Sequence, residues 1–208
     1  MSVKWSILVA TTSSRLVRFF TPLVLDLENQ VAKAKAAESV EVIALFDSKS
    51  MTIGQKRNIL LESARGDYIS YIDDDDVVSP HYVENILGEI ENPIGPDLVT
   101  FNIYRQAVGT PDMLCRHRID VKTDGKVGSD GSWVSPPNHI MVWKRNIAQK
   151  ERFPDKNWME DYDWSRGILG HVKTSVNINE VLYWYRMQIE LAETKGVPWK
   201  YHGQPIVN

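Results

Sequence analysis

The stretch Tyr68-Ile69-Ser70-Tyr71-Ile72-Asp73-Asp74-Asp75-Asp76 decides the fold, because it joins an apolar strand to four consecutive carboxylates. Like charges this close raise each other's pKa, and a divalent cation would relieve the repulsion. Alternation along a strand places the first and third aspartates on one face and the second and fourth on the other. Such oxygens suit Mg²⁺ or Mn²⁺ shared with a substrate diphosphate. The alternative is a solvated acidic loop before a helix that Ser79-Pro80 begins.

The spacing of this run excludes a calcium-binding EF-hand loop. Glu84 stands at the twelfth position counted from Asp73, and Asp75 stands at the third, as that loop requires. Val77 and Val78, however, occupy the fifth and sixth positions, where an oxygen ligand and a glycine are needed.

Strand and helix patterns alternate around the aspartates. Apolar strands are predicted at residues 5–10, 40–46, 68–72 and 98–104. The helices between them are predicted to begin near Thr21-Pro22, to run from Thr52 to a C-cap at Gly66, and to carry an apolar stripe within residues 82–90. Strands separated by single helices form parallel units. We therefore predict an α/β fold, a mostly parallel central sheet flanked by helices in a single domain.

Polar residues follow the first three strands, at residues 11–15, at Asp47 and at the aspartate run. Ligands of open parallel sheets bind beyond the carboxyl ends of the strands, so these groups should meet at one edge. Periodicity fades over residues 105–135, where we expect a functional loop, a hairpin or a disordered lid. Order returns at residues 139–143, in a helix at 160–169 and in a strand at 181–185.

Composition narrows the class of protein. The 208 residues, 43% of them hydrophobic, suffice for one core. A net charge of −3 predicts no global attraction to nucleic acid or anionic membranes. The single Cys115 excludes an intrachain disulfide and a cysteine-rich zinc site. Because we find neither a signal-peptide pattern nor an apolar run of about 20 residues, we expect a cytoplasmic protein without a transmembrane segment.

Four motifs, in order, resemble the GT-A glycosyltransferases, especially the family 2-like group and its small bacterial or phage members. They are Gly54-Gln55-Lys56-Arg57-Asn58, Ala64-Arg65-Gly66-Asp67-Tyr68-Ile69, Ile72-Asp73-Asp74-Asp75-Asp76 and Glu160-Asp161-Tyr162-Asp163-Trp164. The resemblance covers about residues 5–186. It implies one domain, in which residues 1–104 bind the nucleotide sugar. Residues 105–208, with a flexible loop at 105–135 and a C-terminal tail, would bind the acceptor.

The same resemblance implies a metal-dependent, inverting transfer of a sugar from a nucleotide sugar, typically UDP-linked, to an acceptor hydroxyl. The loop after the first strand would border the base, and Asp47 would accept a hydrogen bond from it. Two cations at a helix N-terminus, Lys56 and Arg57, would favour the diphosphate. The donor-binding set is Thr11, Thr12, Ser13, Arg15, Asp47, Lys56, Arg57, Asp73, Asp74, Asp76 and His139. The alternatives are a turn-forming Asp47, a solvated Lys56 and a structural histidine at 139.

Metal ligation is implied for three residues. Asp75 would bind Mn²⁺ or Mg²⁺ bridging the diphosphate, and Asp73 would contact the metal or the ribose. Asp76 would touch the donor sugar. Asp74 replaces a residue that is usually small or apolar in the family, which leaves a register shift of one open. In the tail, His202 would close over the diphosphate as a third ligand.

The resemblance assigns catalysis to Asp161, with Glu160 beside it. An inverting transfer needs a carboxylate to take the proton of the attacking hydroxyl. We expect a cleft beside Trp158 and Trp164 to raise the pKa of Asp161 toward neutrality. The alternative is that both acids only stabilise a helix N-terminus.

The acceptor stays open between a glycan and, as in phage-type enzymes, a hydroxymethylated DNA base. A basic cluster in the middle loop would contact DNA phosphates, which predicts a steep salt dependence; it comprises Arg116, His117, Arg118, Lys122 and Lys126. A nucleotidyltransferase should carry a glycine-rich loop after the first strand, and residues 11–14 contain no glycine. A non-catalytic sugar-nucleotide-binding module would be indifferent to replacement of Asp75 and Asp161.

Overall fold

One mixed sheet forms the centre of the molecule. The structure, a computed structural model, describes residues 2–92, 95–107, 109–121 and 124–187. The strand order is β2-β1-β3-β9-β5-β6-β8-β7, and β10 pairs with β5 and with the short β4. The strands are β1 (Trp5–Thr12), β2 (Val40–Asp47), β3 (Tyr68–Asp73), β4 (Val77–Val78), β5 (Leu98–Ala107), β6 (Met113–His117), β7 (Lys126–Val127), β8 (Trp133–Ser135), β9 (Val142–Lys144) and β10 (Ser175–Met187).

The parallel part of the sheet carries the predicted topology. Strand β1 pairs in parallel with both β2 and β3. The short β9 then runs antiparallel between β3 and β5, and β6 pairs antiparallel with β5. The single-domain α/β fold is confirmed, but the sheet is mixed rather than mostly parallel. The reason is that β9 and the β5–β6 hairpin fill positions that further crossover units would have taken.

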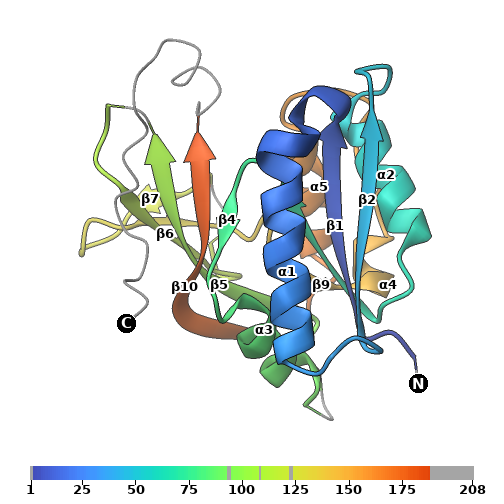
Figure 1. Ribbon diagram of the computed structural model, residues 1–208. Coiled ribbons are helices and arrows are strands. Elements are labelled where there is room, and N and C mark those ends of the chain that lie inside the picture. The colour runs from blue at the N-terminus through green and yellow to red at the C-terminus, as the bar shows by residue number, and fades with distance from the viewer. Residues whose placement is uncertain (1, 93–94, 108, 122–123, 188–208) are drawn as a thin grey trace.

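Helices cover both faces of the sheet (Figure 1). Helices α1 (Thr21–Lys33) and α3 (Tyr82–Ile90) lie in front of it, and α2 (Ile53–Ser63), α4 (Arg145–Ala148) and α5 (Glu160–Leu169) lie behind. Helix α1 buries Leu23, Leu27 and Val31. As the apolar stripe within residues 82–90 predicted, α3 buries Tyr82, which packs against Phe101 at 5.8 Å between ring centroids. Between β1 and α1 the chain makes a 3₁₀ turn, η1 (Ser13–Arg15), and a π-helical turn, η2 (Leu16–Phe20).

Some predicted boundaries were wrong. Helix α2 ends at Ser63, and Ala64, not Gly66, is its C-cap. Gly66 is needed for another reason: a Cβ there would lie 2.6 Å from the backbone nitrogen of Ser6, so only glycine lets the chain pass this close to β1. Helix α3 begins at Tyr82, two residues after Pro80. Of the three expectations for residues 105–135, the hairpin is the one that the structure bears out.

An aromatic cluster behind the sheet supports the edge at which β3 ends. The rings of Phe153 and Trp164 are stacked at 4.4 Å, and Tyr71 and Trp143 meet Trp164 edge-on. Trp164 is 1% exposed. Because these side chains are fully packed, the residues that stand on them are held in one arrangement. Among the residues that the structure describes, no helix is long and apolar enough to cross a bilayer.

Candidate active site

A cleft of about 650 Å³ opens where β1 and β3 end. Nine of the predicted site residues line it: Thr11, Thr12, Arg15, Lys56, Arg57, Asp73, Asp74, Asp75 and Glu160. The chain also brings Lys49, Met51, Ile53 and Asn157 to its wall, which sequence patterns had not indicated. His202 falls outside the described residues.

The aspartate run is a turn rather than a strand. Strand β3 ends at Asp73, and the backbone nitrogen of Asp76 donates to the Asp73 carbonyl at 3.1 Å. Asp74 and Asp76 are nevertheless buried, at 4% and 3% exposure, whereas Asp73 and Asp75 are partly exposed. Burial therefore alternates along the run, but the two strand faces that alternation predicted are not formed, because Asp74 and Asp75 both contact Arg15 whereas Asp76 contacts Tyr183 of β10.

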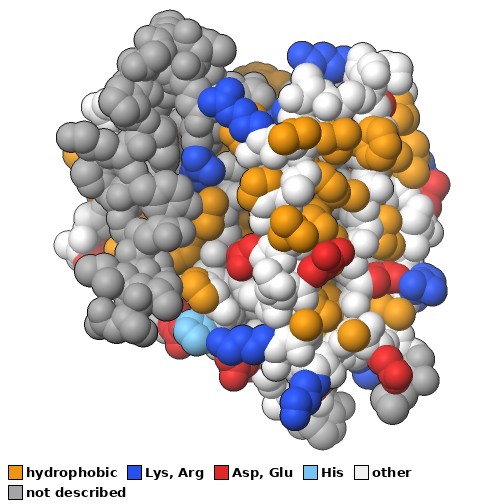
Figure 2. Space-filling view, viewed as in Figure 1, with side chains coloured by type: hydrophobic (Ala, Val, Ile, Leu, Met, Phe, Trp, Pro, Cys, Tyr) orange, Lys and Arg blue, Asp and Glu red, His pale blue; other side chains and the backbone are white. Residues whose placement is uncertain are grey.

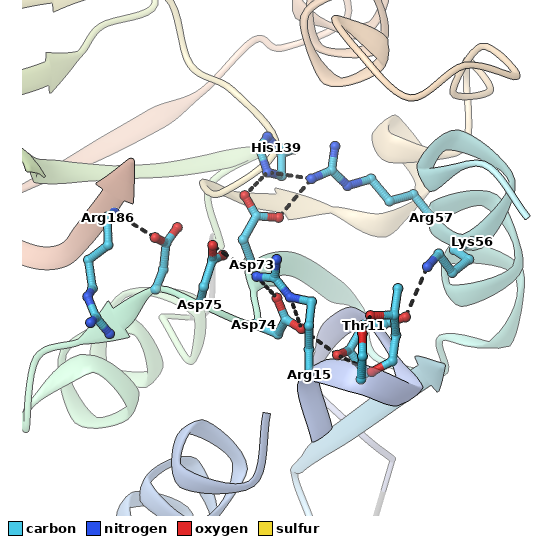
Figure 3. Close-up of polar contacts among 12 residues, drawn as sticks. Thr11, Arg15, Lys56, Arg57, Asp73, Asp74, Asp75, His139 and Arg186 are labelled. Carbon is cyan, nitrogen blue, oxygen red and sulfur yellow. Dashed lines mark hydrogen bonds and ion pairs between the residues drawn. The ribbon is translucent and has the colours of Figure 1, made fainter. Parts of the chain in front are cut away.

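Asp74 fixes the end of β1. Arg15 donates to it with both arms of its guanidinium, from Nε to Oδ2 at 3.0 Å and from Nη2 to Oδ1 at 2.6 Å (Figure 3). Thr11 donates its hydroxyl to the same carboxylate. Nη2 of Arg15 also lies 2.9 Å from Oδ2 of Asp75. The additional aspartate thus has a structural partner of its own.

Asp76 anchors β10. Tyr183 donates its hydroxyl to Oδ2 at 2.6 Å, and the backbone nitrogen of Arg186 donates to Oδ1 at 2.7 Å. Burial, with Asp73 and Asp75 close by, raises the pKa of Asp76 well above its ordinary value. Both of its oxygens are engaged and it is not among the residues that line the cleft, so its contact with a donor sugar stays a prediction.

Arg57 is the buried cation beneath the cleft. Its Nη2 donates to Oδ1 of Asp73 at 2.8 Å and lies 2.9 Å from Nε2 of His139, while Nη1 donates to Glu160 (Figure 3). The guanidinium also lies over the ring of Tyr71, 5.8 Å from its centroid. Arg57 therefore holds two carboxylates in place, one from β3 and one from α5.

Lys56 joins the first two strands in the same way. Its ammonium donates to the carbonyl of Thr11 and to Oδ1 of Asp47, both at 2.9 Å. Lys56 and the backbone nitrogen of Met51 hold the pKa of Asp47 below its ordinary range. Ser13 lies against this corner, with its hydroxyl donating to the Asp47 carbonyl at 3.2 Å.

The N-terminus of α2 is not the open anion site that the sequence suggested. Thr52 caps the helix in a capping box. The backbone nitrogen of Ile53 donates to the side chain of Asn157 at 2.9 Å, and that of Gly54 donates to the Lys156 carbonyl at 3.2 Å. The loop before α5 thus satisfies donors that a diphosphate would otherwise use.

Asp161 stands at the first turn of α5, next to His139. The ring Nδ1 of His139 lies 2.9 Å from Oδ2 of Asp161, and Nε2 lies 3.4 Å from Oδ2 of Asp73. The turn into α5 passes through Met159, a non-glycine residue in the left-handed region (φ 62°). Glu160 and Asp161 follow it directly as the first two residues of α5. Such backbone strain is concentrated at functional sites.

The electrostatics of this pair correct one expectation. Burial alone would raise the pKa of Asp161, but His139 and Arg57 outweigh it and lower the pKa to about 2. The tryptophans that were expected to raise it do not act on the carboxylate: Trp158 is 79% exposed, and Trp164 donates its indole N–H to the Ala148 carbonyl.

His139 shows the reciprocal shift. Burial and Arg57 both lower its pKa, but Asp73 and Asp161 together raise it above its ordinary value. The ring is 4% exposed and packs near Tyr71. The prediction that His139 lies near the sugar or the acceptor stays a prediction, and its observed role is to connect the two acids.

Of the aspartates in the run, Asp75 is the one that could serve as a ligand for a divalent cation. In the described part of the chain, Oδ1 of Asp75 is the carboxylate oxygen of the run that has no protein partner, and no three acidic, histidine or cysteine side chains form a ready-made cage. Magnesium commonly binds through one or two carboxylates plus substrate phosphates. Asp75 therefore fits a cation whose shell a diphosphate completes.

Comparison with known proteins identifies the family. The protein-family model described as glycosyl transferase family 2 matches residues 26–157 of the sequence. The chain belongs to this family. A search of curated proteins gives no match. The matched residues include the aspartate run at the end of β3, whereas the Glu160-Asp161 pair at the start of α5 lies beyond them.

Solved structures share the fold of this family 2 domain. The S. aureus TarS fragment 1–349 is 15% identical with a TM-score of 0.61, covering 92% of this chain and 63% of its own. The same fragment in complex with UDP-GlcNAc gives 15% identity and a TM-score of 0.60, covering 97% and 60%. S. aureus TarS itself gives 14% and 0.59, covering 92% and 38%. The chain thus spans about three fifths of the TarS fragment.

Proposed function

We propose that this family 2 domain transfers a sugar from a UDP-sugar to an acceptor hydroxyl. The observation that carries the proposal is the cleft at the ends of β1 and β3, where Asp75 lines the wall with its Oδ2 paired to Arg15 and its Oδ1 without a partner among the described residues. Its volume of about 650 Å³ lies within the range of small-ligand sites. That S. aureus TarS has been solved with UDP-GlcNAc supports a UDP-linked donor.

The roles within the cleft follow from what each side chain is free to do. Thr12, which is partly exposed at the end of β1, and the exposed Ser13 that follows it would border the base beside Asp47. Lys56 and Arg57 are committed to Asp47 and Asp73, so their part is to hold these carboxylates while the donor binds. Side chains fixed in this way need no rearrangement when charge develops in the reaction.

A divalent cation bound at Asp75 with the diphosphate would act as a Lewis acid and stabilise the departing UDP. Asp75 suits this task because its carboxylate is 24% exposed and faces the cleft. Asp73 is held from below by Arg57 and His139. It would position the ribose or complete the cation site.

Asp161 would remove the proton of the acceptor. The acceptor oxygen attacks the anomeric carbon, the bond from that carbon to the diphosphate breaks, UDP departs, and the proton passes to the Asp161 carboxylate. With a pKa of about 2, Asp161 is ionised at neutral pH and able to accept. It is a weak base, so proton transfer would accompany the formation of the new bond, as the hydroxyl becomes acidic. Attack from the face opposite UDP would invert the anomeric configuration.

The acceptor is proposed to be a glycan. Both arginines of the basic middle-loop cluster are paired with aspartates: Arg116 with Asp130 at 2.6 Å, and Arg118 with Asp120 at 2.9 Å. Lys126 is exposed, and Lys122 lies outside the described residues. Burial lowers the pKa of His117 to about 4, so it is neutral. The face in Figure 2 likewise mixes basic and acidic side chains. Nucleic-acid binding favours a surface of one sign.

Calorimetry tests the donor half of this proposal. We would titrate UDP-, GDP- and CMP-sugars, with and without Mn²⁺, into the wild type, Asp75→Asn and Asp67→Asn. Asp67 lies at the opposite end of β3 and forms an exposed pair with Lys4, which makes it a matched control. We expect metal-dependent binding of a UDP-sugar that Asp75→Asn loses and Asp67→Asn keeps. Absence of binding across the panel would contradict the proposal.

A further inference from the structure

Arg15 contacts two aspartates, Asp74 and Asp75, and it binds them with different strength. Its contacts to Asp74 are a two-armed hydrogen bond to a carboxylate with a further donor in Thr11. Its contact to Asp75 is a single ion pair, Nη2 to Oδ2 at 2.9 Å, and Arg15 lies beside both carboxylates in the close-up of Figure 3. The stronger attachment is therefore to Asp74, and the contact to Asp75 is the one that can be exchanged.

A divalent cation at Asp75 would meet this guanidinium at close range. Arginine cannot lose its proton in a protein, so the repulsion between the two cations has no chemical relief. The side chains of Arg15 and Asp75 are 21% and 24% exposed, which places their interaction in a partly desolvated setting where charges act strongly. One of the two cations must give way.

Arg15 has somewhere to go. Nε and one Nη2 hydrogen bond can stay on Asp74, because that carboxylate is buried and fixed by Thr11. Arg15 also lines the cleft itself, so the Nη2 donor that leaves Asp75 remains beside the place of the diphosphate. Guanidinium groups bind phosphate oxygens as well as carboxylates.

We propose that Arg15 and the divalent cation compete for Asp75, and that the donor diphosphate resolves the competition by drawing the guanidinium to itself. This inference rests on the proposed use of a divalent cation with a UDP-sugar. It makes Arg15 a positioning residue that couples metal binding to nucleotide binding. By linkage, UDP must then raise the affinity for the metal by the same factor by which the metal raises the affinity for UDP.

Metal binding in the absence of turnover tests the inference. We would follow Mn²⁺ by electron paramagnetic resonance with the full chain, alone and with UDP, in the wild type, Arg15→Gln, Arg15→Lys and Arg65→Gln. Arg65→Gln is a matched control, because it removes another two-armed arginine–carboxylate pair, with Glu41, at a 74% exposed position. Thermal unfolding of each variant checks that it is folded.

We expect Arg15→Gln to bind Mn²⁺ alone about tenfold more tightly than the wild type, as loss of one charged hydrogen bond to Asp75 implies. UDP should raise the affinity for Mn²⁺ less in this variant than in the wild type. The reason is that the variant has no guanidinium to compete for Asp75 and none for the diphosphate to draw away. Arg15→Lys, which keeps a cation but cannot span both carboxylates, should lie between the two. Arg65→Gln should match the wild type.

Two results would overturn the inference, and they are distinguishable. If the wild type binds Mn²⁺ with UDP but Arg15→Gln binds Mn²⁺ alone no more tightly, Arg15 does not compete and the proposed function stands. If no variant binds Mn²⁺, with or without UDP, the metal part of the proposed function fails and the inference fails with it.

Discussion

Replacing Arg57 with methionine will leave acidic side chains without their buried cation. Glu160 is 4% exposed, and within the described residues Arg57 is its ion-pair partner. Breaking such a buried pair from one side costs about 3–5 kcal/mol, because the remaining charge is neither solvated nor compensated. Methionine keeps much of the packing against Tyr71 and Phe153, whose ring centroids lie 5.8 and 5.7 Å from the guanidinium carbon. The loss should therefore be mainly electrostatic.

Urea unfolding at pH 7 measures this loss, and a second substitution identifies its origin. We expect Arg57→Met to lower the free energy of unfolding by about 3–5 kcal/mol, or the melting temperature by about 6–20 °C for a chain of this size. Adding Glu160→Gln should restore part of the loss, with a coupling of about 0.5–3 kcal/mol, because the uncompensated charge is removed.

The exposed pair of Arg65 with Glu41 supplies the control. Because surface pairs are worth about 0–1 kcal/mol, Arg65→Met should barely change stability. The reasoning is refuted if Arg57→Met costs less than about 1 kcal/mol, or if Glu160→Gln recovers nothing in the Arg57→Met background. Either result would mean that water or another group already compensates Glu160.

Three further outcomes are expected. Gly54→Ala should destabilise the fold by about 1–3 kcal/mol in urea unfolding, because a Cβ there would lie 1.9 Å from the Pro154 carbonyl oxygen, whereas Gly88→Ala, with open space around it in α3, should stabilise it by about 0.5–1 kcal/mol. The pKa of Asp161 is about 2, below its ordinary value. The stability that its ionised carboxylate contributes to the fold is therefore fully present above pH 4 and is lost as the pH falls toward 2. Between pH 4 and pH 2 the wild type should therefore lose about 2 kcal/mol more of its free energy of unfolding than Asp161→Asn does. If the two curves of stability against pH run parallel, the ion pair of Asp161 with His139 is contradicted. In transfer assays, Asp161→Asn should lower turnover about 10²–10⁴-fold while UDP-sugar binding persists. The control is Asp163→Asn, on the same helix but paired with Lys156 in solvent, which should keep its turnover. Equal losses in the two variants would mean that Asp161 is not the base.

Salt separates the two acceptor classes once turnover is measured. A glycan acceptor predicts little change in acceptor affinity between 50 and 200 mM salt, whereas a DNA acceptor held through several phosphates predicts a loss of about 10³-fold or more. The ion pairs of Arg116 and Arg118 with their own aspartates favour the first result.

Most elements of the fold follow from local patterns. The strands at β1, β2, β3 and β5 and the helices α1, α2, α3 and α5 lie where apolar periodicity placed them, to within a few residues. What local patterns missed was non-local. The three residues of β9 acquire strand geometry from pairing with β3 and β5, and α4 is a single turn that follows it. Segments this short carry no periodicity of their own.

The position of the site could also be predicted from the sequence, but the pKa values and ion pairs of its side chains could not. That polar clusters end β1, β2 and β3 is readable along the sequence, and parallel pairing then requires them to meet. Which aspartate keeps a free oxygen depends on partners far away in the chain, namely Arg15, His139 and Tyr183. The low pKa of Asp161 likewise comes from His139 and Arg57, more than 20 residues away on other elements. A pattern of residue types reports local propensity, whereas burial and Coulomb interactions are set by neighbours that only folding brings within a few ångströms.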